Sequence, residues 1–522
     1  MRILPRARCA VSGPDVVRVV GAGVMGRGIA QVALVAGYRV QLCDARPDTV
    51  DEAASFVMQM IRRMAEKGQI SEPDAASAVG RLESGVEIEA PDDAVGLVIE
   101  AVVERHDIKS KVLASLERAL PRAVLATNTS SLSVNELAGS LVDGRRLIGL
   151  HFFNPVPLMK VVEVVPGLRT SEAAVQVAEA FVARIGHAGI RAQDTPGFLV
   201  NYLGRALPTE ALALLAERAA GVEDIDAIVR ECLGLRMGPF ELLDLTGLDV
   251  SHPVMEIVSD GYYHEPRLRP SPLGRARLAA GLLGRKSGSG FYRYDLAETA
   301  RPSKAALLGD PSTPLHVHAN PELKAVLRTA GALLVDRPTT ESVSVVSPWG
   351  EPAYRLATRA GLDPARAIGV DPLSLGSTRV TVMVPAAGDP KLLGGAVGAL
   401  ERAGRPAVLQ ADGPAPIAQR VLAVIVNLAC AAAELGIGSP SDIELGARLG
   451  LGYPEGPLSM GDRVGPRRVV RVLDGLHGYT GDPRYRATPW LRTRAECGMS
   501  LQDKGTRPGE LIDDRSSDVQ PD

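Results

Sequence analysis

The sequence lacks a marked excess of charge of either sign. Among its 522 residues, 58 lysines and arginines stand against 61 aspartates and glutamates, which gives a formal net charge of −3. This balance argues against nucleic acid as a main partner, because binding to a phosphate backbone calls for a strongly basic surface.

Cysteine is scarce, and the cysteines are scattered without pairs at metal-ligand spacing. This pattern predicts a reducing compartment and no disulfide framework. His316 and His318 have no clear third ligand beside them, so we expect surface residues there and no metal site. The cysteines are Cys9, Cys43, Cys232, Cys430 and Cys497.

Long hydrophobic runs are also missing. The start, MRILPRARCAVSGPDVV, is basic but has no apolar region of roughly 7–15 residues, so it is a poor signal peptide. The run RVLAVIVNLACAAAELG, from Arg420, is interrupted by Asn427; we interpret it as a core helix too short to span a membrane. We therefore expect a cytoplasmic protein without a membrane partner.

A glycine-rich turn opens the ordered part of the chain. The β-rich run VVRVV leads into GAGVMG, and a helical pattern follows. Gly21 permits the tight turn, Gly23 lets the backbone approach a pyrophosphate, and Gly26 allows close helix packing. Asp44 ends the next strand and favours NAD over NADP, although Arg46 beside it weakens that preference. The pattern predicts a dinucleotide site; an ordinary glycine turn is the alternative.

Polar residues follow later strands of the same α/β pattern. Gly96–Glu104 is a near-continuous apolar run, as parallel sheets require. Asn128 and Ser130 come at the carboxyl end of another strand, where open α/β sheets bind ligands. Helix capping is the alternative role for this stretch, and Ser133 with Glu136 fits a capping box.

A histidine and a glutamate lie within two apolar runs that read as neighbouring strands. A turn at Asn154-Pro155 would fold Glu163 back toward His151. A carboxylate on one imidazole nitrogen fixes the tautomer and leaves the other nitrogen as a general base. A lone histidine on a strand is usually a core residue, but here it follows a dinucleotide site and stands beside a buried carboxylate.

Residues 16–295 resemble the L-3-hydroxyacyl-CoA dehydrogenase family. The motifs that carry the likeness are GAGVMGRGIAQ, EAVVERHDIK, NTSSL, GLHFFNPVPLMKVVEVV, DTPGFLVNYL and GPFELLDLTGLD. The resemblance implies oxidation of an acyl-CoA thioester with NAD. It makes His151 the base for the 3-hydroxyl proton and Glu163 its orienting partner.

The resemblance also implies binding roles. Ser130 and Asn201 resemble the groups that hold the substrate oxygen. With an acyl-CoA substrate, Lys67 is expected to face the CoA phosphates, although a lysine on a helix is more often simply solvated. The residues expected to contact NAD are Gly21, Gly23, Val24, Met25, Gly26, Asp44, Glu104, Lys109, Asn128 and Asn154.

Two other classes of protein fit part of the pattern. A short-chain β-hydroxyacid dehydrogenase also begins with a glycine loop, but it uses a lysine at the reacting centre and would not need HFFNP. A non-catalytic NAD-binding structural protein would have no need of Ser130, His151, Glu163 and Asn201 together.

The second half repeats the helical part of the first. Asp194–Gly247 aligns with Asp412–Gly465 at a constant offset of 218 residues. The stretch before this repeat aligns loosely with HFFNPVPLMKVVEVV. That alignment places the counterparts of His151, Glu163 and Asn201 at Ile368, Val382 and Gln419.

No glycine loop precedes the aligned stretch. We therefore expect a degenerate second copy without chemistry; an unrelated α/β domain is the alternative. This two-part layout resembles the bacterial enzymes of phenylacetate breakdown, which implies 3-hydroxyadipyl-CoA as the substrate. A general 3-hydroxybutyryl-CoA dehydrogenase is the alternative, and the family likeness suggests a homodimer or a chain closed by its own repeat.

The expected fold is thus an α/β Rossmann-type dinucleotide-binding domain plus an all-α domain, followed by a degenerate second copy that joins a small α/β segment to a second all-α domain. The expected parts are a disordered leader (1–15), the NAD-binding domain (16–190), a helical domain (191–296), a linker (297–320), the degenerate α/β segment (321–410), the second helical domain (411–500) and a disordered tail (501–522).

Overall fold

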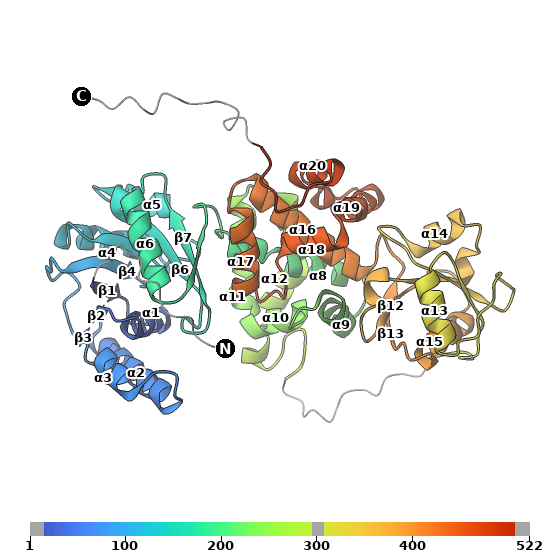
Figure 1. Cartoon of the computed structure of the whole chain (residues 1–522), viewed down its shortest axis with the longest axis horizontal. Helices are drawn as coiled ribbons and strands as arrows, with labels where there is room; N and C mark the ends of the chain where they lie inside the picture. Colours follow the sequence, from blue (N-terminus) through green and yellow to red (C-terminus); the bar gives the residue numbers. More distant parts are fainter. Residues whose placement is uncertain (1–14, 295–306, 507–522) are drawn as a thin grey trace.

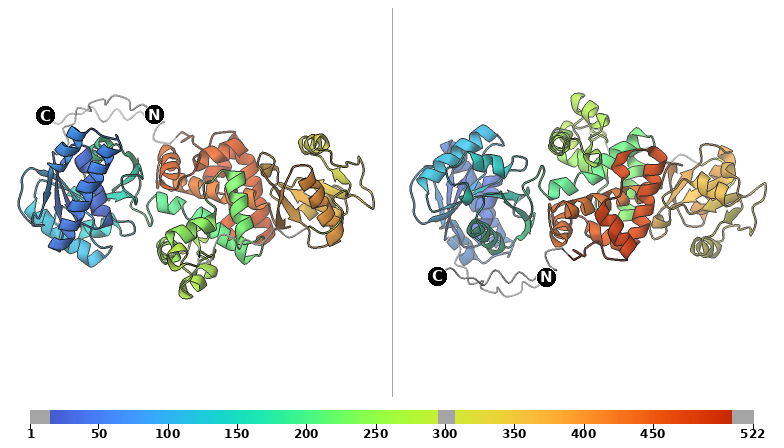
Figure 2. Two further views of the ribbon diagram at one scale, coloured as in Figure 1. Left: turned by 90° about the horizontal axis from the view of Figure 1, so that it is seen from below. Right: turned by 90° about the horizontal axis from the view of Figure 1, so that it is seen from above.

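The computed structural model of the chain describes residues 15–294 and 307–506. Most of the expected leader and tail, and part of the expected linker, lie outside the described residues. Figure 1 shows the first α/β domain at one end, the second at the other, and the two helical domains packed together between them. The perpendicular views of Figure 2 show the same order.

An eight-stranded sheet forms the centre of the first α/β domain, in the order β3-β2-β1-β4-β5-β6-β7-β8. Neighbouring strands are parallel except for β6 and β7. Alternate residues of β1 enter two different apolar cores, since Val16 and Val20 lie in one and Val17 and Val19 in the other. Both faces of the sheet are therefore buried, which explains the continuous apolar runs of its strands.

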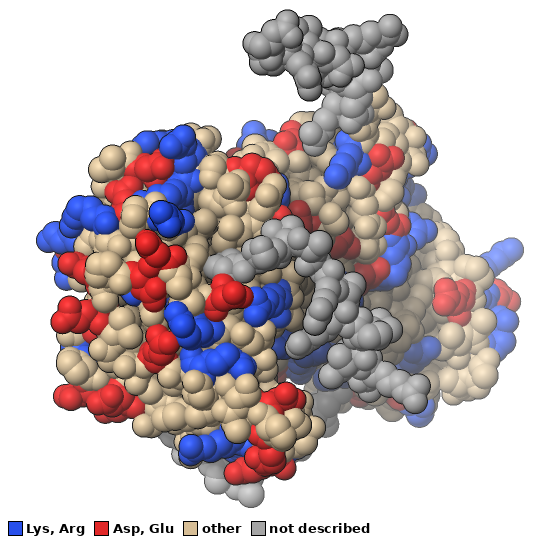
Figure 3. Space-filling model, turned by 60° about the vertical axis from the view of Figure 1, so that its left-hand side comes forward, with Lys and Arg blue, Asp and Glu red and all other residues tan. Residues whose placement is uncertain are grey.

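The strands of this sheet are β1 (Val16–Val20), β2 (Arg39–Cys43), β3 (Leu82–Ser84), β4 (Val95–Glu100), β5 (Val124–Thr127), β6 (Leu147–Phe152), β7 (Val161–Pro166) and β8 (Ala188–Arg191). The helices around it are α1 (Val24–Val35), α2 (Pro47–Glu66), α3 (Glu72–Val79), α4 (His106–Ala119), α5 (Val134–Gly139) and α6 (Glu172–Arg184). On the face shown in Figure 3, basic and acidic side chains are interspersed over this domain.

The two helical domains share one apolar core, which also reaches the first sheet. The first consists of α7 (Val200–Leu203), α8 (Ala206–Ala216), α9 (Val222–Leu233), α10 (Pro239–Thr246), α11 (Leu248–Gly261) and α12 (Pro272–Ala279). The second consists of α16 (Ile417–Glu434), α17 (Pro440–Gly450), α18 (Pro457–Val464), α19 (Pro466–Thr480) and α20 (Pro489–Cys497).

Helix α16 is the centre of this shared core. By length and composition it could cross a membrane, contrary to the expectation that it is too short, but 89% of it is buried inside the molecule. It packs against α8 and α9 of the first helical domain and against α18 and α19 of its own. Its apolar surface is therefore used in packing.

A five-stranded sheet forms the second α/β domain, in the order β13-β12-β11-β10-β9. Its only antiparallel pair is β11 with β12. The sheet thus repeats the last five strands of the first one, β4 to β8, in both order and direction. Its elements are β9 (Leu315–Val317), α13 (Pro321–Thr329), β10 (Val343–Val346), α14 (Ala353–Arg359), β11 (Ala367–Val370), β12 (Val380–Val384), α15 (Pro390–Arg402) and β13 (Ala407–Ala411).

Two expected boundaries differ from the structure. Strand β9 lies within the stretch expected to be a linker, because an apolar pair, Leu315 and Val317, is too short to be recognised as a strand from sequence. The expected tail begins too early, since Leu501 is fully buried and its N–H donates to Asp462 at 2.8 Å.

The two halves contact each other reciprocally. The N–H of Gln193 donates to the carbonyl of Ile437 at 2.9 Å, and the N–H of Ala411 donates to that of Ala219 at 2.7 Å. Ala411 is the counterpart of Gln193 at the 218-residue offset, and Ile437 is the counterpart of Ala219. The same hydrogen bond is therefore formed twice, once from each half to the other. Such self-complementary contacts are the mark of a two-fold interface, here formed within one chain.

Candidate active site

The glycine loop between β1 and α1 has the geometry of an anion cradle. Gly21 has a φ of +105°, and a Cβ on Gly26 would lie 1.7 Å from the carbonyl oxygen of Gly21. A Cβ on Gly23 would meet nothing within 4 Å, and no side chain caps α1. The open space and the uncapped N–H groups at a helix start fit a bound pyrophosphate, so these residues suit NAD. Val24 is exposed and Met25 half-buried at the same turn.

Asp44 stands at the end of β2, beside the loop. Its carboxylate accepts hydrogen bonds from the N–H of Ala22 at 2.9 Å and from the N–H of Arg46 at 3.1 Å. Asp44 therefore supports the glycine loop, a role that the sequence did not predict. A carboxylate has further lone pairs for ribose hydroxyls, so its preference for NAD over NADP stays a prediction.

Glu104 organises the loop that follows β5. Its Oε1 accepts the hydroxyl of Thr129 at 2.7 Å and the N–H groups of Ser130 and Ser131 at 2.8 and 3.1 Å. Burial disfavours the charged form of Glu104, but the bond from Thr129 and the ammonium of Lys109 outweigh it and lower its pKa. Ser130 is thereby held at the exposed carboxyl end of the sheet.

The other residues expected to bind ligands differ in exposure. Lys109 is fully buried, and its Nζ lies 2.7 Å from Glu100 and 3.4 Å from Glu104. Its contact with NAD stays a prediction. In this structure its ammonium group forms an ion pair with Glu104 and contributes to the lowered pKa of that carboxyl. Asn128 accepts the N–H of Phe152 at 2.9 Å. Asn154, which precedes a cis proline, and Lys67 are exposed, and their ligand contacts stay predictions.

His151 and Glu163 face each other across β6 and β7. The antiparallel register pairs the two residues, and Nδ1 of His151 lies 2.5 Å from Oε2 of Glu163. His151 is 6% exposed and Glu163 is completely buried. The ring of His151 packs against Phe153, at 4.4 Å between centroids. One nitrogen is thus fixed by a carboxylate, which leaves Nε2 for a substrate.

Glu163 also connects His151 to the helical domain. Its second oxygen, Oε1, accepts the N–H groups of Leu199 and Val200, both at 2.8 Å. These two residues begin the helix α7, which carries the half-buried Asn201. One carboxylate therefore sets both the orientation of His151 and the position of the turn that bears Asn201.

The sequence reasoning missed Asp194 as a supporting residue. Its carboxylate accepts the N–H groups of Val134 and Asn135 at 3.0 and 2.7 Å, and so caps the helix after the Ser130 loop. In the second half, Asp412 caps α14 in the same way, through the N–H groups of Ala353 and Tyr354. The recurrence of this aspartate at the 218-residue offset was the signal that could have identified it.

The second half has a different residue at the histidine position. Gly149 and Gly369 occupy matching places, since a Cβ there would press on the first residue of α5 or α14. Counting from them, Asp371 corresponds to His151; its N–H donates to Thr381, which corresponds to Glu163. The expected counterparts, Ile368 and Val382, are therefore wrong, because the loose alignment misplaced the β11–β12 register. Gln419, the counterpart of Asn201 at the 218-residue offset, donates its side-chain N–H to Oδ1 of Asp371 at 2.8 Å.

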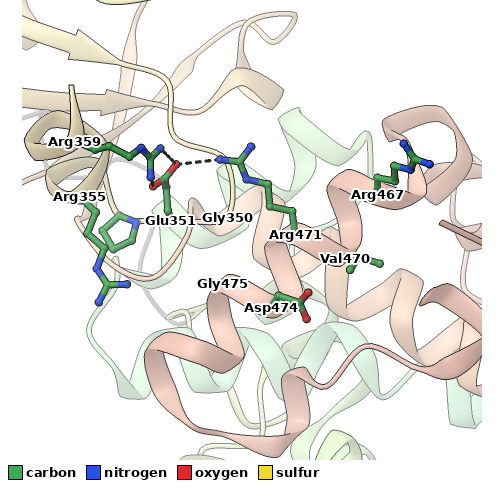
Figure 4. Close-up of a pocket in the computed structure, with 10 residues that line it drawn as sticks. Gly350, Glu351, Arg355, Arg359, Arg467, Val470, Arg471, Asp474 and Gly475 are labelled. Atoms are coloured by element: carbon green, nitrogen blue, oxygen red, sulfur yellow. Dashed lines mark hydrogen bonds and ion pairs between the residues drawn. The ribbon is translucent and has the colours of Figure 1, made fainter. Parts of the chain in front are cut away.

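A cleft of about 590 Å³ lies in this second half, between α14 and α19. Figure 4 shows Arg359 and Arg471 directed at Glu351 within it. Arg467 donates to the carbonyl of Ala495, and Arg355 lies over the ring of Tyr479. Since its arginines are already engaged, we interpret the cleft as a structural ion-pair network. In the described part of the chain, no group of three metal-binding side chains occurs.

Comparison with known proteins identifies the family. The model described as 3-hydroxyacyl-CoA dehydrogenase, NAD binding domain, matches residues 16–195. The model for the C-terminal domain of the same family matches residues 197–294 and again 417–507.

Individual relatives agree with these matches. The chain is 34% identical over 485 residues to 3-hydroxyadipyl-CoA dehydrogenase of Escherichia coli (strain K12), which covers 92% of this chain and 97% of the relative. The mitochondrial hydroxyacyl-coenzyme A dehydrogenase of Sus scrofa is 36% identical over 288 residues, 53% of this chain.

A solved structure gives the same result. The crystal structure of 3-hydroxybutyryl-CoA dehydrogenase from Escherichia coli K12 superposes with a TM-score of 0.81 at 32% identity and covers 92% of this chain. With the glycine loop, the His151–Glu163 pair and the repeated helical domain in place, the chain belongs to the 3-hydroxyacyl-CoA dehydrogenase family.

Proposed function

We propose that this protein oxidises L-3-hydroxyacyl-CoA to 3-oxoacyl-CoA with NAD, and that 3-hydroxyadipyl-CoA is its main substrate. The observation that carries the reaction is the buried contact between His151 and Glu163. The substrate rests on the likeness to the Escherichia coli 3-hydroxyadipyl-CoA dehydrogenase over most of both chains.

His151 acts as the base in this proposal. Glu163 holds Nδ1, so Nε2 accepts the proton of the 3-hydroxyl group, and Glu163 stabilises the imidazolium that forms. Ser130 and Asn201 hold the substrate oxygen. When bound, NAD supplies the acceptor for the hydride that leaves C3. In the reverse direction the imidazolium returns the proton.

Two alternatives are kept. A general 3-hydroxybutyryl-CoA dehydrogenase is favoured by relatives that carry that name, such as the one from Bacillus subtilis (strain 168), 37% identical over 280 residues. A non-catalytic NAD-binding role has no such support. We further propose that the enzyme is cytoplasmic. Homodimerisation stays a prediction; within one chain, the second helical domain packs on the first.

The test measures NADH formation with 3-hydroxybutyryl-, 3-hydroxyhexanoyl- and 3-hydroxyadipyl-CoA. We expect the highest kcat/KM for the adipyl compound. His151→Ala should lower kcat by roughly 10²–10⁴-fold, the usual effect of losing a positioned acid–base group, while NAD still binds. His477→Ala, an exposed histidine of α19, is the control. Near-normal kcat in His151→Ala would exclude the base assignment, and no turnover of any substrate by the wild type would favour the non-catalytic role.

A further inference from the structure

Arg205 is a half-buried cation close to the candidate active site, and it forms no ion pair with any residue that the structure describes. It lies between α7 and α8, one helical turn after Asn201, and its Nε donates to the carbonyl oxygen of Asn201 at 2.9 Å. Its Nη1 is buried and has no hydrogen-bond partner in the described structure. Burial lowers the pKa of this guanidinium to about 10.

Three other arginines also have one buried guanidinium nitrogen without a hydrogen bond, but each of them has two other polar partners: Arg81, Arg267 and Arg484. Arg18 is buried, and its guanidinium donates to Gln41 and to two backbone carbonyls. Arg420 is buried between Glu210 and Glu217. An enclosed guanidinium N–H without an acceptor costs free energy, so such a group calls for an explanation. A ligand that brings its own acceptor is one.

The second half of the chain supplies the surroundings of Arg205. Leu451 packs against the turn that carries it, since a Cβ on Gly204 would lie 3.1 Å from that side chain. Tyr453, which is 7% exposed, is close enough to Arg205 to interact with its charge. A phenol beside a guanidinium adds a hydroxyl donor to the same place.

The internal repeat shows that these two polar residues belong to one half only. At the 218-residue offset, Arg205 corresponds to Ala423 and Tyr453 corresponds to Leu235. Both counterparts are buried and apolar. The charged and hydroxyl-bearing pair is therefore found on the side with the His151–Glu163 pair, and the side where Asp371 replaces the histidine has neither.

We infer that Arg205, assisted by Tyr453, receives the terminal carboxylate of a dicarboxylic acyl group whose 3-hydroxyl is held at His151 and Asn201. Arg205 follows Asn201 by four residues, across a turn between α7 and α8 whose backbone stays right-handed helical, which corresponds to roughly 6 Å of rise. In a six-carbon acyl group the carboxylate is three carbon–carbon bonds from C3, a reach of that order. A guanidinium binds a carboxylate through two parallel N–H bonds.

This inference deepens the proposed function and rests on it, so its test uses binding as well as turnover. Adipyl-CoA and hexanoyl-CoA have equal chain length, lack the 3-hydroxyl and differ in the terminal carboxylate. Their Kd values are measured by calorimetry for the wild type, Arg205→Met, Arg205→Lys and Tyr453→Phe. The exposed Arg236 provides the control variant Arg236→Met, which removes one positive charge elsewhere in the same domain.

We expect the wild type to bind adipyl-CoA more tightly than hexanoyl-CoA. Arg205→Met should reduce that preference by roughly 10²–10³-fold, because the carboxylate loses a buried charged partner. Arg205→Lys and Tyr453→Phe should reduce it less, and Arg236→Met should leave it unchanged. The ratio of kcat/KM for 3-hydroxyadipyl- and 3-hydroxyhexanoyl-CoA should follow the same order.

Equal losses of affinity for both ligands in Arg205→Met, or an unchanged preference, would overturn the assignment. If Arg205→Met does not fold, an unchanged preference in Arg205→Lys and Tyr453→Phe overturns it instead. A wild type that prefers adipyl-CoA in binding but oxidises no 3-hydroxyacyl-CoA would contradict the proposed function and still support the carboxylate site.

Discussion

Asp371 shows what became of the histidine position in the second copy. It is completely buried; its Oδ1 accepts the side-chain N–H of Gln419 and the N–H of Leu373, while Oδ2 has no hydrogen-bond partner among the described residues. Desolvation raises the pKa of this carboxyl to about 6. The loop before α14 is pressed onto α19, since a Cβ on Gly475 would lie 1.9 Å from the carbonyl oxygen of Gly350. The position that corresponds to His151 is thus completely buried and carries a carboxyl group in place of an imidazole.

This burial predicts how stability depends on pH. The unfolded carboxyl has a pKa near 4, so between about pH 4 and pH 6 the folded chain keeps a proton that the unfolded chain releases. The free energy of unfolding therefore falls as the pH rises through this window, by at most roughly 3 kcal/mol from this group. Asp371→Asn removes the ionisable group and should be more stable than the wild type at pH 8, by ~1–3 kcal/mol.

Urea unfolding from pH 4.5 to pH 8 measures the difference between variant and wild type. The gain should shrink toward pH 4.5, where the wild-type carboxyl is protonated. Asp389→Asn, at an exposed helix N-terminus, is the control and should show no such trend. A difference independent of pH would show that Asp371 does not keep its proton in the fold.

The His151–Glu163 pair and Arg205 differ in how far the sequence could identify them. His151 and Glu163 are twelve residues apart on two adjacent strands, so a local turn is sufficient to bring them together. Tyr453 lies about 250 residues beyond Arg205 in the sequence. Sequence patterns report local spacing. The proximity of Tyr453 to Arg205 depends on how the second half packs on the first, so the sequence alone could not reveal it.

At the scale of elements, the glycines of the loop between β1 and α1 have two different roles. Gly26 is needed for backbone packing, and Gly23 leaves space for a ligand. Gly26→Ala would place a methyl group 1.7 Å from a backbone oxygen, so we expect a loss of stability of roughly 1–3 kcal/mol or more. Gly23→Ala meets open space, so its melting temperature without NAD should stay close to the wild type. Its affinity for NAD should fall by roughly 10–10²-fold, since the pyrophosphate needs that space.

Differential scanning fluorimetry and NAD titration distinguish the two effects. Gly139→Ala, in the exposed end of α5, is the control for a glycine substitution in a helix and should keep both properties. A stable Gly26→Ala, or a Gly23→Ala with normal NAD affinity, would contradict the roles given to these positions.

Strand positions were predictable where the apolar runs were long, and the second sheet shows the limit. Its strands follow the repeat, but the paired residues of β11 and β12 are apolar or glycine. Beyond them, Asp371 and Thr381 replace the histidine and the glutamate, so the sequence has no pair recognisable as His151 opposite Glu163. Without such a pair, the sequence does not determine where the gaps of the alignment belong. The predicted counterparts of His151 and Glu163 were therefore misplaced. The structure fixed the register through Gly369, which allows α14 to approach β11 closely.

At the scale of the whole molecule, the second copy has kept the parts that dock and lost the parts that bind a dinucleotide. Strands β4 to β8 have counterparts in β9 to β13, whereas β1 to β3 and the glycine loop have none in the described second half. The kept strands include β13, which contacts α9 just as β8 contacts α17. The retained elements are thus the ones that complete the pseudo-two-fold interface.

A buried charge cluster joins the two halves at this interface. Arg420 of α16 lies 2.5 Å from Glu210 of α8, and both side chains are 1% exposed. Arg420 also contacts Glu217 at 2.6 Å and the hydroxyl of Tyr485 at 2.7 Å. Separation of the two halves would break the ion pair and leave Arg420 and Glu210 without each other.

Arg420→Met should therefore destabilise the chain by roughly 3–5 kcal/mol, because Glu210 is left buried without its partner. Urea unfolding measures the loss. Arg463→Met, which removes an exposed pair with Glu455, should change stability by about 1 kcal/mol or less. Adding Glu210→Leu to Arg420→Met should recover part of the loss, since the unpaired carboxylate is then removed. An Arg420→Met variant as stable as the wild type would mean that apolar packing alone holds the halves together.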